Sequence, residues 1–249
     1  MTDPDLAALV RRADPDRFLG ALFAPPEARR WLFVLYGFNH ELARAREVAS
    51  QPPLALIRLH WWREVVEGAE RAHPLAASLR AGLAGGIFSA AALTALIDAR
   101  EAEAEPIPDR AAFLAYARGT AGGLARSAGT VLGVTDPDAL AALEDLGTGY
   151  GIAGILRAAP ALEAAGRDLL PQDGTDPATL RADAARLLRH RAPRQGLAAA
   201  LPAVLARREV QRRADGLARR PRPPRATSAT GSAPAAAGSP PRAPAPTRG

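Results

Sequence analysis

The chain has 249 residues, enough to bury the core of one or two domains. It contains 0 cysteines, which excludes disulfides, thiolate metal sites and cysteine nucleophiles. The net charge is +6, and all 32 basic residues are arginine, as expected from a GC-rich genome. Much of the excess positive charge lies near the end of the chain. The charge therefore does not indicate a specific nucleic-acid partner. The first residues carry no export signal and no apolar run is long enough to span a bilayer, so we expect a cytoplasmic protein.

Residues 1–218 have the pattern of an all-α domain of about eight helices. Helix starts are predicted where an aspartate precedes a proline, at Asp14, Asp136 and Asp176. Further helical segments are predicted within residues 28–49, 53–71, 88–105, 109–133, 146–171 and 197–213. Residues 219–249 contain only Arg, Pro, Ala, Thr, Ser and Gly, which predicts a disordered tail.

Three passages in chain order carry a family resemblance: "LFVLYGFNHELARARE", "YARGTAGGLARSAGTVLG" and "LGTGYGIAGILRAAPALEAAGRDLLP". They resemble the two aspartate-rich helices and the small-residue helix of the squalene/phytoene synthase family, over about residues 14–214. The resemblance implies an isoprenoid synthase-like helical bundle with a central cavity. Within the family, Phe38 to Glu41 and Gly154 to Ala158 resemble a non-catalytic branch related to a mitochondrial complex I assembly factor.

The active members of such a family ionise an allylic diphosphate with Mg²⁺, which requires carboxylates facing the metal from two helices. In the first motif, the resemblance places Asn39, His40, Ala43 and Glu47 at the relevant positions, and only Glu47 is acidic. In the second motif, the corresponding residues are Gly151, Gly154, Arg157 and Ala158, none of which is acidic. We therefore expect that the chain binds no metal cofactor. Mg²⁺ would be needed only if the chain acts as a prenyl transferase.

Gly147, Gly151, Gly154 and Ala158 follow one another on one face of the second motif helix. Glycine within a helix costs roughly 1 kcal/mol relative to alanine, so a stripe of glycines needs a compensating contact. Two interpretations remain open: the stripe receives a neighbouring helix, or it forms a groove for the hydrocarbon tail of a ligand.

Other charged residues also have two interpretations each. In the layout that the family resemblance implies, Arg44, Arg157 and Arg167 converge at the mouth of the cavity. There they would either hold a phosphate or pair with Glu41, Glu47, Glu163 or Asp168. Asp98, Glu101 and Glu105 have the spacing of a metal-binding helix face, with Glu47 as a further weak candidate, although a solvated face is the simpler reading. Of Trp61 and Trp62, we expect one in the core and one at its edge.

Three functions follow from these observations. The first is a catalytically silent assembly or scaffold factor whose partners are respiratory complex I subunits or assembly factors, located in the cytoplasm or at the periphery of the inner membrane. The second is a Mg²⁺-dependent prenyl transferase of terpenoid biosynthesis that condenses isoprenoid diphosphates. The third is a protein that binds an isoprenoid, quinone or other lipid without turnover.

Overall fold

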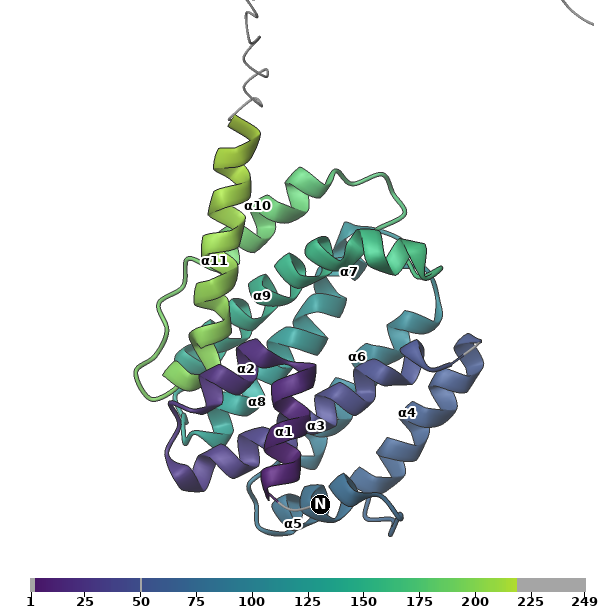
Figure 1. The fold of residues 1–249 in the computed structure, drawn as a ribbon, viewed down its shortest axis with the longest axis vertical. Helices are drawn as coiled ribbons and strands as arrows, with labels where there is room; N and C mark the ends of the chain where they lie inside the picture. Colours follow the sequence, from purple (N-terminus) through teal and green to yellow (C-terminus); the bar gives the residue numbers. More distant parts are fainter. Residues whose placement is uncertain (1–2, 50, 219–249) are drawn as a thin grey trace, which may run out of the picture.

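The structure is a computed structural model that describes residues 3–49 and 51–218. Within these ranges every regular element is a helix, as predicted (Figure 1). The elements are α1 (Asp3–Ala13), α2 (Pro15–Ala21), α3 (Pro26–Glu47), α4 (Pro52–Val66), α5 (Pro74–Ala84), α6 (Ala90–Glu101), η1 (Ala102–Ala104), α7 (Arg110–Ala117), η2 (Arg118–Gly122), α8 (Gly123–Val131), α9 (Pro137–Ala164), α10 (Pro177–Leu187) and α11 (Leu197–Ala218). The predicted disordered tail, residues 219–249, lies outside the described residues.

Proline at the first turn starts many of these helices, because its fixed φ fits the helix and its missing N–H is not needed there. The three predicted aspartate caps are all present. The side chain of Asp14 accepts a hydrogen bond from the backbone of Arg17, and Asp136 and Asp176 cap α9 and α10 in the same way.

The helix count exceeds the expected eight. One reason is that the predicted helix over residues 109–133 divides into α7, η2 and α8, where η2 is a π-helical turn. A second reason is that the predicted helix over residues 88–105 ends at Glu101 and continues as the short 3₁₀ turn η1.

Helix α3 runs through the middle of the bundle (Figure 1) and contacts α1, α4, α5 and α8. Its residues from Leu32 to Phe38 are all buried, as the apolar pattern on every side of this segment predicts. Phe38 is fully buried and meets Trp62 of α4 edge to face, with ring centroids 5.5 Å apart. Trp62 is buried and Trp61 is half-buried, so one tryptophan lies in the core and one at its edge.

Helix α9, which carries the second motif, packs against η2, α8, α10 and α11. None of the described helices is long and apolar enough to cross a membrane. The two motif helices, α3 and α9, belong to the same bundle, and both contact α8.

Candidate functional site

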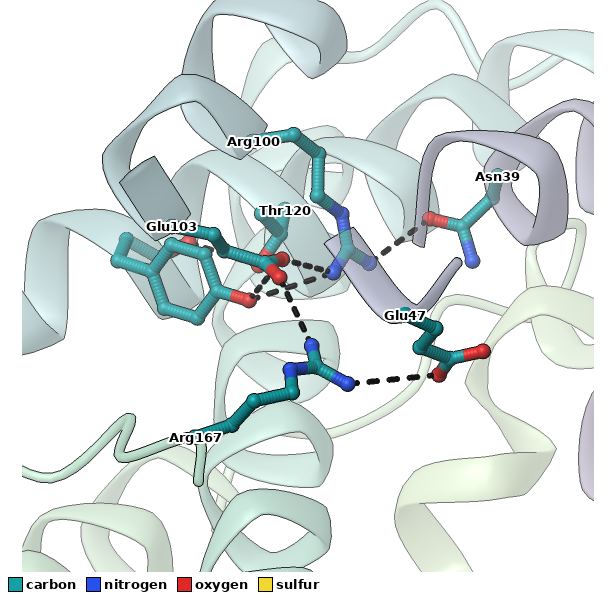
Figure 2. Close-up of polar contacts among 7 residues, drawn as sticks. Asn39, Glu47, Arg100, Glu103, Thr120 and Arg167 are labelled. Carbon is teal, nitrogen blue, oxygen red and sulfur yellow. Dashed lines mark hydrogen bonds and ion pairs between the residues drawn. The ribbon is translucent and has the colours of Figure 1, made fainter. Parts of the chain in front are cut away.

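A polar cluster joins the two motif regions, and its centre is Glu103 of η1 (Figure 2). The Glu103 side chain is only 3% exposed. Its Oε1 lies 2.7 Å from Nη1 of Arg100 and accepts a hydrogen bond of 2.7 Å from the hydroxyl of Tyr116. Its Oε2 accepts a hydrogen bond of 3.1 Å from Nη2 of Arg167. Both carboxylate oxygens of Glu103 are therefore occupied by partners from this chain.

Arg100 of α6 ties this cluster to the first motif helix. It donates to the Tyr116 hydroxyl at 3.2 Å and to Oδ1 of Asn39 at 3.4 Å. Burial alone lowers the pKa of Arg100, but the neighbouring Tyr116 and Glu103 raise it, and the net shift is upward. For the tyrosine, burial acts in the opposite direction and raises the pKa of Tyr116 above its usual value. The Tyr116 hydroxyl therefore keeps the proton that it donates to Glu103. The cluster is held together by one carboxylate and two guanidinium groups.

Arg167 reaches the cluster because of the way α9 ends. Gly166 adopts the left-handed conformation, with φ of +67°, and its N–H donates to the carbonyl of Glu163, while the N–H of Arg167 donates to the carbonyl of Leu162. This Schellman arrangement turns the chain so that Arg167 contacts both Glu103 and, at 3.8 Å, Glu47 of α3. Arg167 thereby links the ends of both motif helices to η1.

A second buried group lies near the first one. Arg17 forms a 2.5 Å ion pair with Asp14 and lies over the ring of Tyr150, 4.8 Å from its centroid. The Tyr150 hydroxyl, on α9, donates to Asp16 at 3.2 Å. Burial lowers the pKa of Arg17 but Asp14 and the nearby tyrosines raise it more, so the guanidinium stays charged. Arg17 is near enough for its charge to act on the pKa of Arg100.

The first motif does not assemble carboxylates. Asn39 is a hydrogen-bond acceptor for Arg100, and His40 and Ala43 are half-buried on the same helix. Glu47, the one acid of the motif, is exposed and paired with Arg167.

The glycine stripe of the second motif divides into two parts. A Cβ on Gly147 would lie 2.5 Å from the Cβ of Ala125, and a Cβ on Gly151 would lie 2.5 Å from the Cβ of Ala121. These two glycines therefore let α9 approach the η2 and α8 segment closely. A Cβ on Gly154 would meet nothing nearer than a side-chain nitrogen of Arg157, 4.0 Å away. The stripe is a helix-packing seam at its first two glycines and open at the third.

The acidic residues of the candidate metal face on α6 form ion pairs with an arginine. Asp98 and Glu101 lie 2.6 Å and 2.7 Å from the same guanidinium nitrogen of Arg63. Glu105 does not continue this face, because α6 ends at Glu101 and Glu105 has an extended backbone. In the part of the chain that the structure describes, no three His, Asp or Glu side chains are grouped as metal ligands. The residues at the two motif positions also do not fit the Mg²⁺ clamp of the catalytic members, since Ala158 and the glycines supply no oxygen ligand.

In this structure Arg157 and Arg167 line different hollows, and each of the three arginines forms an ion pair. Arg167 lines a hollow of about 330 Å³ together with Arg46, Glu103 and Asp168. Arg157 lies in a different hollow, where it forms a 2.6 Å ion pair with Glu209 of α11.

Arg44 pairs with Glu41 on its own helix at 3.5 Å. Asp168, a proposed partner of these arginines, instead accepts hydrogen bonds from Leu170 and Gln172 within its own turn.

Sequence reasoning missed Arg17, Arg100, Glu103 and Tyr116. The spacing of Arg100 and Glu103, three residues apart at a helix end, is the one local signal of a pair. Nothing in the sequence near Glu103 indicates that its side chain is buried, since it belongs to the acidic run "EAEAE".

The model of the squalene/phytoene synthase family matches residues 10–238. The chain belongs to the squalene/phytoene synthase family. Among solved structures, the squalene synthase HpnC from Alicyclobacillus acidocaldarius aligns with a TM-score of 0.67 at 17% identity, over 86% of this chain and 94% of that one. A dehydrosqualene synthase solved with a ligand aligns with a TM-score of 0.59 at 16% identity, over 86% and 74%. At these identities the two structures establish the fold, which is the isoprenoid synthase-like bundle that the resemblance predicted.

Sequence relatives include proteins that are named as assembly factors of complex I. The human protein named "NADH dehydrogenase (ubiquinone) complex I, assembly factor 6" is 28% identical over 181 residues, covering 69% of this chain and 54% of that protein. The mouse protein of the same name is 30% identical over 171 residues, covering 66% and 51%. The chain thus spans about half the length of the curated relatives it matches.

Proposed function

We propose that this chain is a catalytically silent member of the squalene/phytoene synthase family that acts as an assembly or scaffold factor for a respiratory complex of the complex I type. The observation that carries the proposal is the polar cluster around Glu103. A catalytic member needs free carboxylates to hold metal ions on a diphosphate. Here the second motif helix offers none on the relevant face, and the buried Glu103 is neutralised by Arg100 and Arg167.

The packing of α9 supports the same proposal. At Gly147 and Gly151, α9 lies against the chain at Ala121 and Ala125, so this part of the motif face serves a helix contact. The human and mouse relatives are named as assembly factors of complex I, which supports an assembly role with complex I as the partner.

The proposal is tested in the native host by deleting the gene and measuring NADH:quinone oxidoreductase activity in isolated membranes. We expect that activity to fall, and to be restored equally by the wild-type chain and by Glu47→Gln, because the carboxylate of Glu47 has no catalytic task. Normal complex I activity in the deletion strain, with loss of an isoprenoid product that Glu47→Gln does not restore, would instead establish the prenyl transferase.

One observation favours a second function, the binding of an anionic isoprenoid without turnover. Arg46 and Arg167 both line the hollow of about 330 Å³, so the hollow presents two guanidinium groups of the kind that bind a diphosphate. Titration calorimetry with farnesyl diphosphate, in the absence of Mg²⁺, tests this function. Binding that is lost in Arg167→Gln and kept in the control Arg157→Gln would support it, and heats equal to dilution would rule it out.

A further inference from the structure

An aromatic hollow lies between α3 and α4 and shares no residue with the polar cluster around Glu103. Its lining residues are Glu41 of α3, Ile57, Arg58, Trp61 and Trp62 of α4, and His73 before α5. Its volume is about 260 Å³, whereas pockets for small-molecule ligands usually measure about 300–1,000 Å³. The hollow therefore suits one large side chain better than a whole cofactor.

The aromatic rings hold this hollow in shape. The rings of Trp61 and Trp62 meet edge to face with centroids 4.9 Å apart, and the ring of His73 meets them at 5.8 Å and 5.0 Å. The Nδ1 atom of His73 accepts a hydrogen bond of 3.2 Å from the backbone N–H of Leu75, which fixes the imidazole at the start of α5. Because the walls are already ordered, a partner that fills the hollow pays little for ordering them.

An apolar stripe on α4 leads into the hollow. Leu54 and Ile57 are 46% and 64% exposed, and with the half-buried Trp61 they lie at i, i+3 and i+7, on one side of the helix. Leu59 and Trp62 mark the buried side of α4. Figure 1 shows α4 at an edge of the bundle. Exposed apolar surface that continues into a hollow indicates a site of interaction with another molecule.

The exposed charge around the stripe is positive. Arg58 is exposed on the same side of α4, four residues after Leu54 and three before Trp61. Across the hollow, Arg44 of α3 is 41% exposed, whereas the Glu41 side chain is only 11% exposed and forms a 3.5 Å ion pair with Arg44. The carboxylate is thus largely withdrawn from solvent, and the two guanidinium groups complement acidic residues on a partner.

A helix of another protein fits this surface best. A stripe of two helical turns beside a hollow is the arrangement by which a groove receives an amphipathic helix and one of its apolar side chains. A bilayer has no single projecting side chain to fill a hollow of this kind. A symmetric contact with a second copy would bring the arginines of both chains together, which is unfavourable.

We propose that the α4 face, defined by Leu54, Ile57, Arg58, Trp61 and the aromatic hollow, binds an acidic amphipathic helix of a partner protein, which places one apolar side chain in the hollow. The proposal stands on this face alone and does not depend on the assembly role.

The first experiment is photo-crosslinking in the native host, with p-benzoylphenylalanine at position 54 of the full chain. The control carries the same group at position 205 of α11, which Figure 1 shows on the other side of the bundle and where leucine is 44% exposed. We expect one protein to be crosslinked from position 54 and not from position 205. Mass spectrometry should place the crosslink in an amphipathic segment with acidic residues, and Ile57→Ser should abolish it.

The second experiment measures the affinity of the purified full chain for a synthetic peptide of the crosslinked segment, by fluorescence anisotropy. Ile57→Ser should weaken binding about tenfold or more, because it removes an apolar contact at the centre of the face. Arg58→Glu should weaken binding and make it less sensitive to salt. The matched controls are Leu205→Ser and Arg208→Glu on α11, which replace exposed residues of the same kinds and should leave the affinity unchanged. Circular dichroism should show native helix content in all four variants.

Several results would overturn the proposal. They are the absence of a crosslink specific to position 54, a crosslink to a basic segment, or an equal loss of affinity in the α4 and α11 variants. A dimer in light scattering that Ile57→Ser separates would show that the face joins two copies of this chain. Flotation with phosphatidylglycerol vesicles that Ile57→Ser abolishes would show that the face lies on a membrane.

Discussion

Replacing Glu103 with glutamine tests the polar cluster with the smallest change of shape. Glu103→Gln keeps the side-chain volume but removes the negative charge between Arg100 and Arg167, whose side chains are only 16% and 14% exposed. Removing one partner of a buried ion pair costs about 3–5 kcal/mol, because it leaves an uncompensated buried charge. Glutamine retains one oxygen that accepts a hydrogen bond, and both arginines have some access to water, so we expect a loss at the lower end, about 3 kcal/mol.

The free energy of unfolding is measured by urea denaturation followed by circular dichroism, with Glu101→Gln as the matched control. Glu101 is two residues away and also pairs with an arginine, Arg63, but its side chain is 44% exposed. An exposed pair contributes about 0–1 kcal/mol, so the control should lose much less stability. For a chain of this size, a loss of about 3 kcal/mol corresponds to a fall in melting temperature of roughly 6–12 °C. Equal effects of the two substitutions would refute the idea that Glu103 is the central buried carboxylate.

The remaining predictions concern the glycine stripe and the tyrosines. Gly151→Ala should destabilise the protein by about 1–3 kcal/mol, because the new Cβ would lie 2.5 Å from the Cβ of Ala121. Gly154→Ala should stabilise it by up to about 1 kcal/mol through helix propensity, because the new Cβ would have space. Thermal melts in which both variants shift the melting temperature in the same direction would contradict the divided stripe. All 3 tyrosines have a pKa raised by burial, so tyrosinate absorbance should not appear in the native protein near pH 10. Because the folded pKa lies above the unfolded one, this contribution to stability is complete below about pH 10 and is lost as the pH rises further; normal ionisation of a tyrosine at pH 10 without unfolding would refute it.

The fold was accessible from the sequence because its signals are local. Helix starts at Asp14, Asp136 and Asp176 follow from cap chemistry within a few residues, and the burial of α3 follows from an apolar pattern on all sides. The division at η2 was not accessible, because a π-helical turn has no distinct residue pattern here. It coincides with the close approach of α9, which is a tertiary contact.

The candidate site was only partly accessible. The motif comparison located the positions where carboxylates are missing, and ion pairing of Arg44 with Glu41 was one of the alternatives considered. The cluster itself joins Asn39, Arg100, Glu103 and Arg167, which the tertiary fold brings together from α3, α6, η1 and the end of α9. A single sequence shows neither the burial of an acid within an acidic run nor the partner it finds in space.

The central claim is that this chain does not turn over isoprenoid diphosphates, and pyrophosphate release measures it most directly. Purified full-length protein is incubated with farnesyl or geranylgeranyl diphosphate and Mg²⁺, and released pyrophosphate is compared with a blank that lacks protein. The account predicts no release above the blank, because Gly151, Gly154 and Ala158 provide no metal ligand and Glu103 is neutralised by two arginines. Release of pyrophosphate by the wild-type chain, with loss of that release in Glu47→Gln, would contradict the account and establish a metal-dependent enzyme.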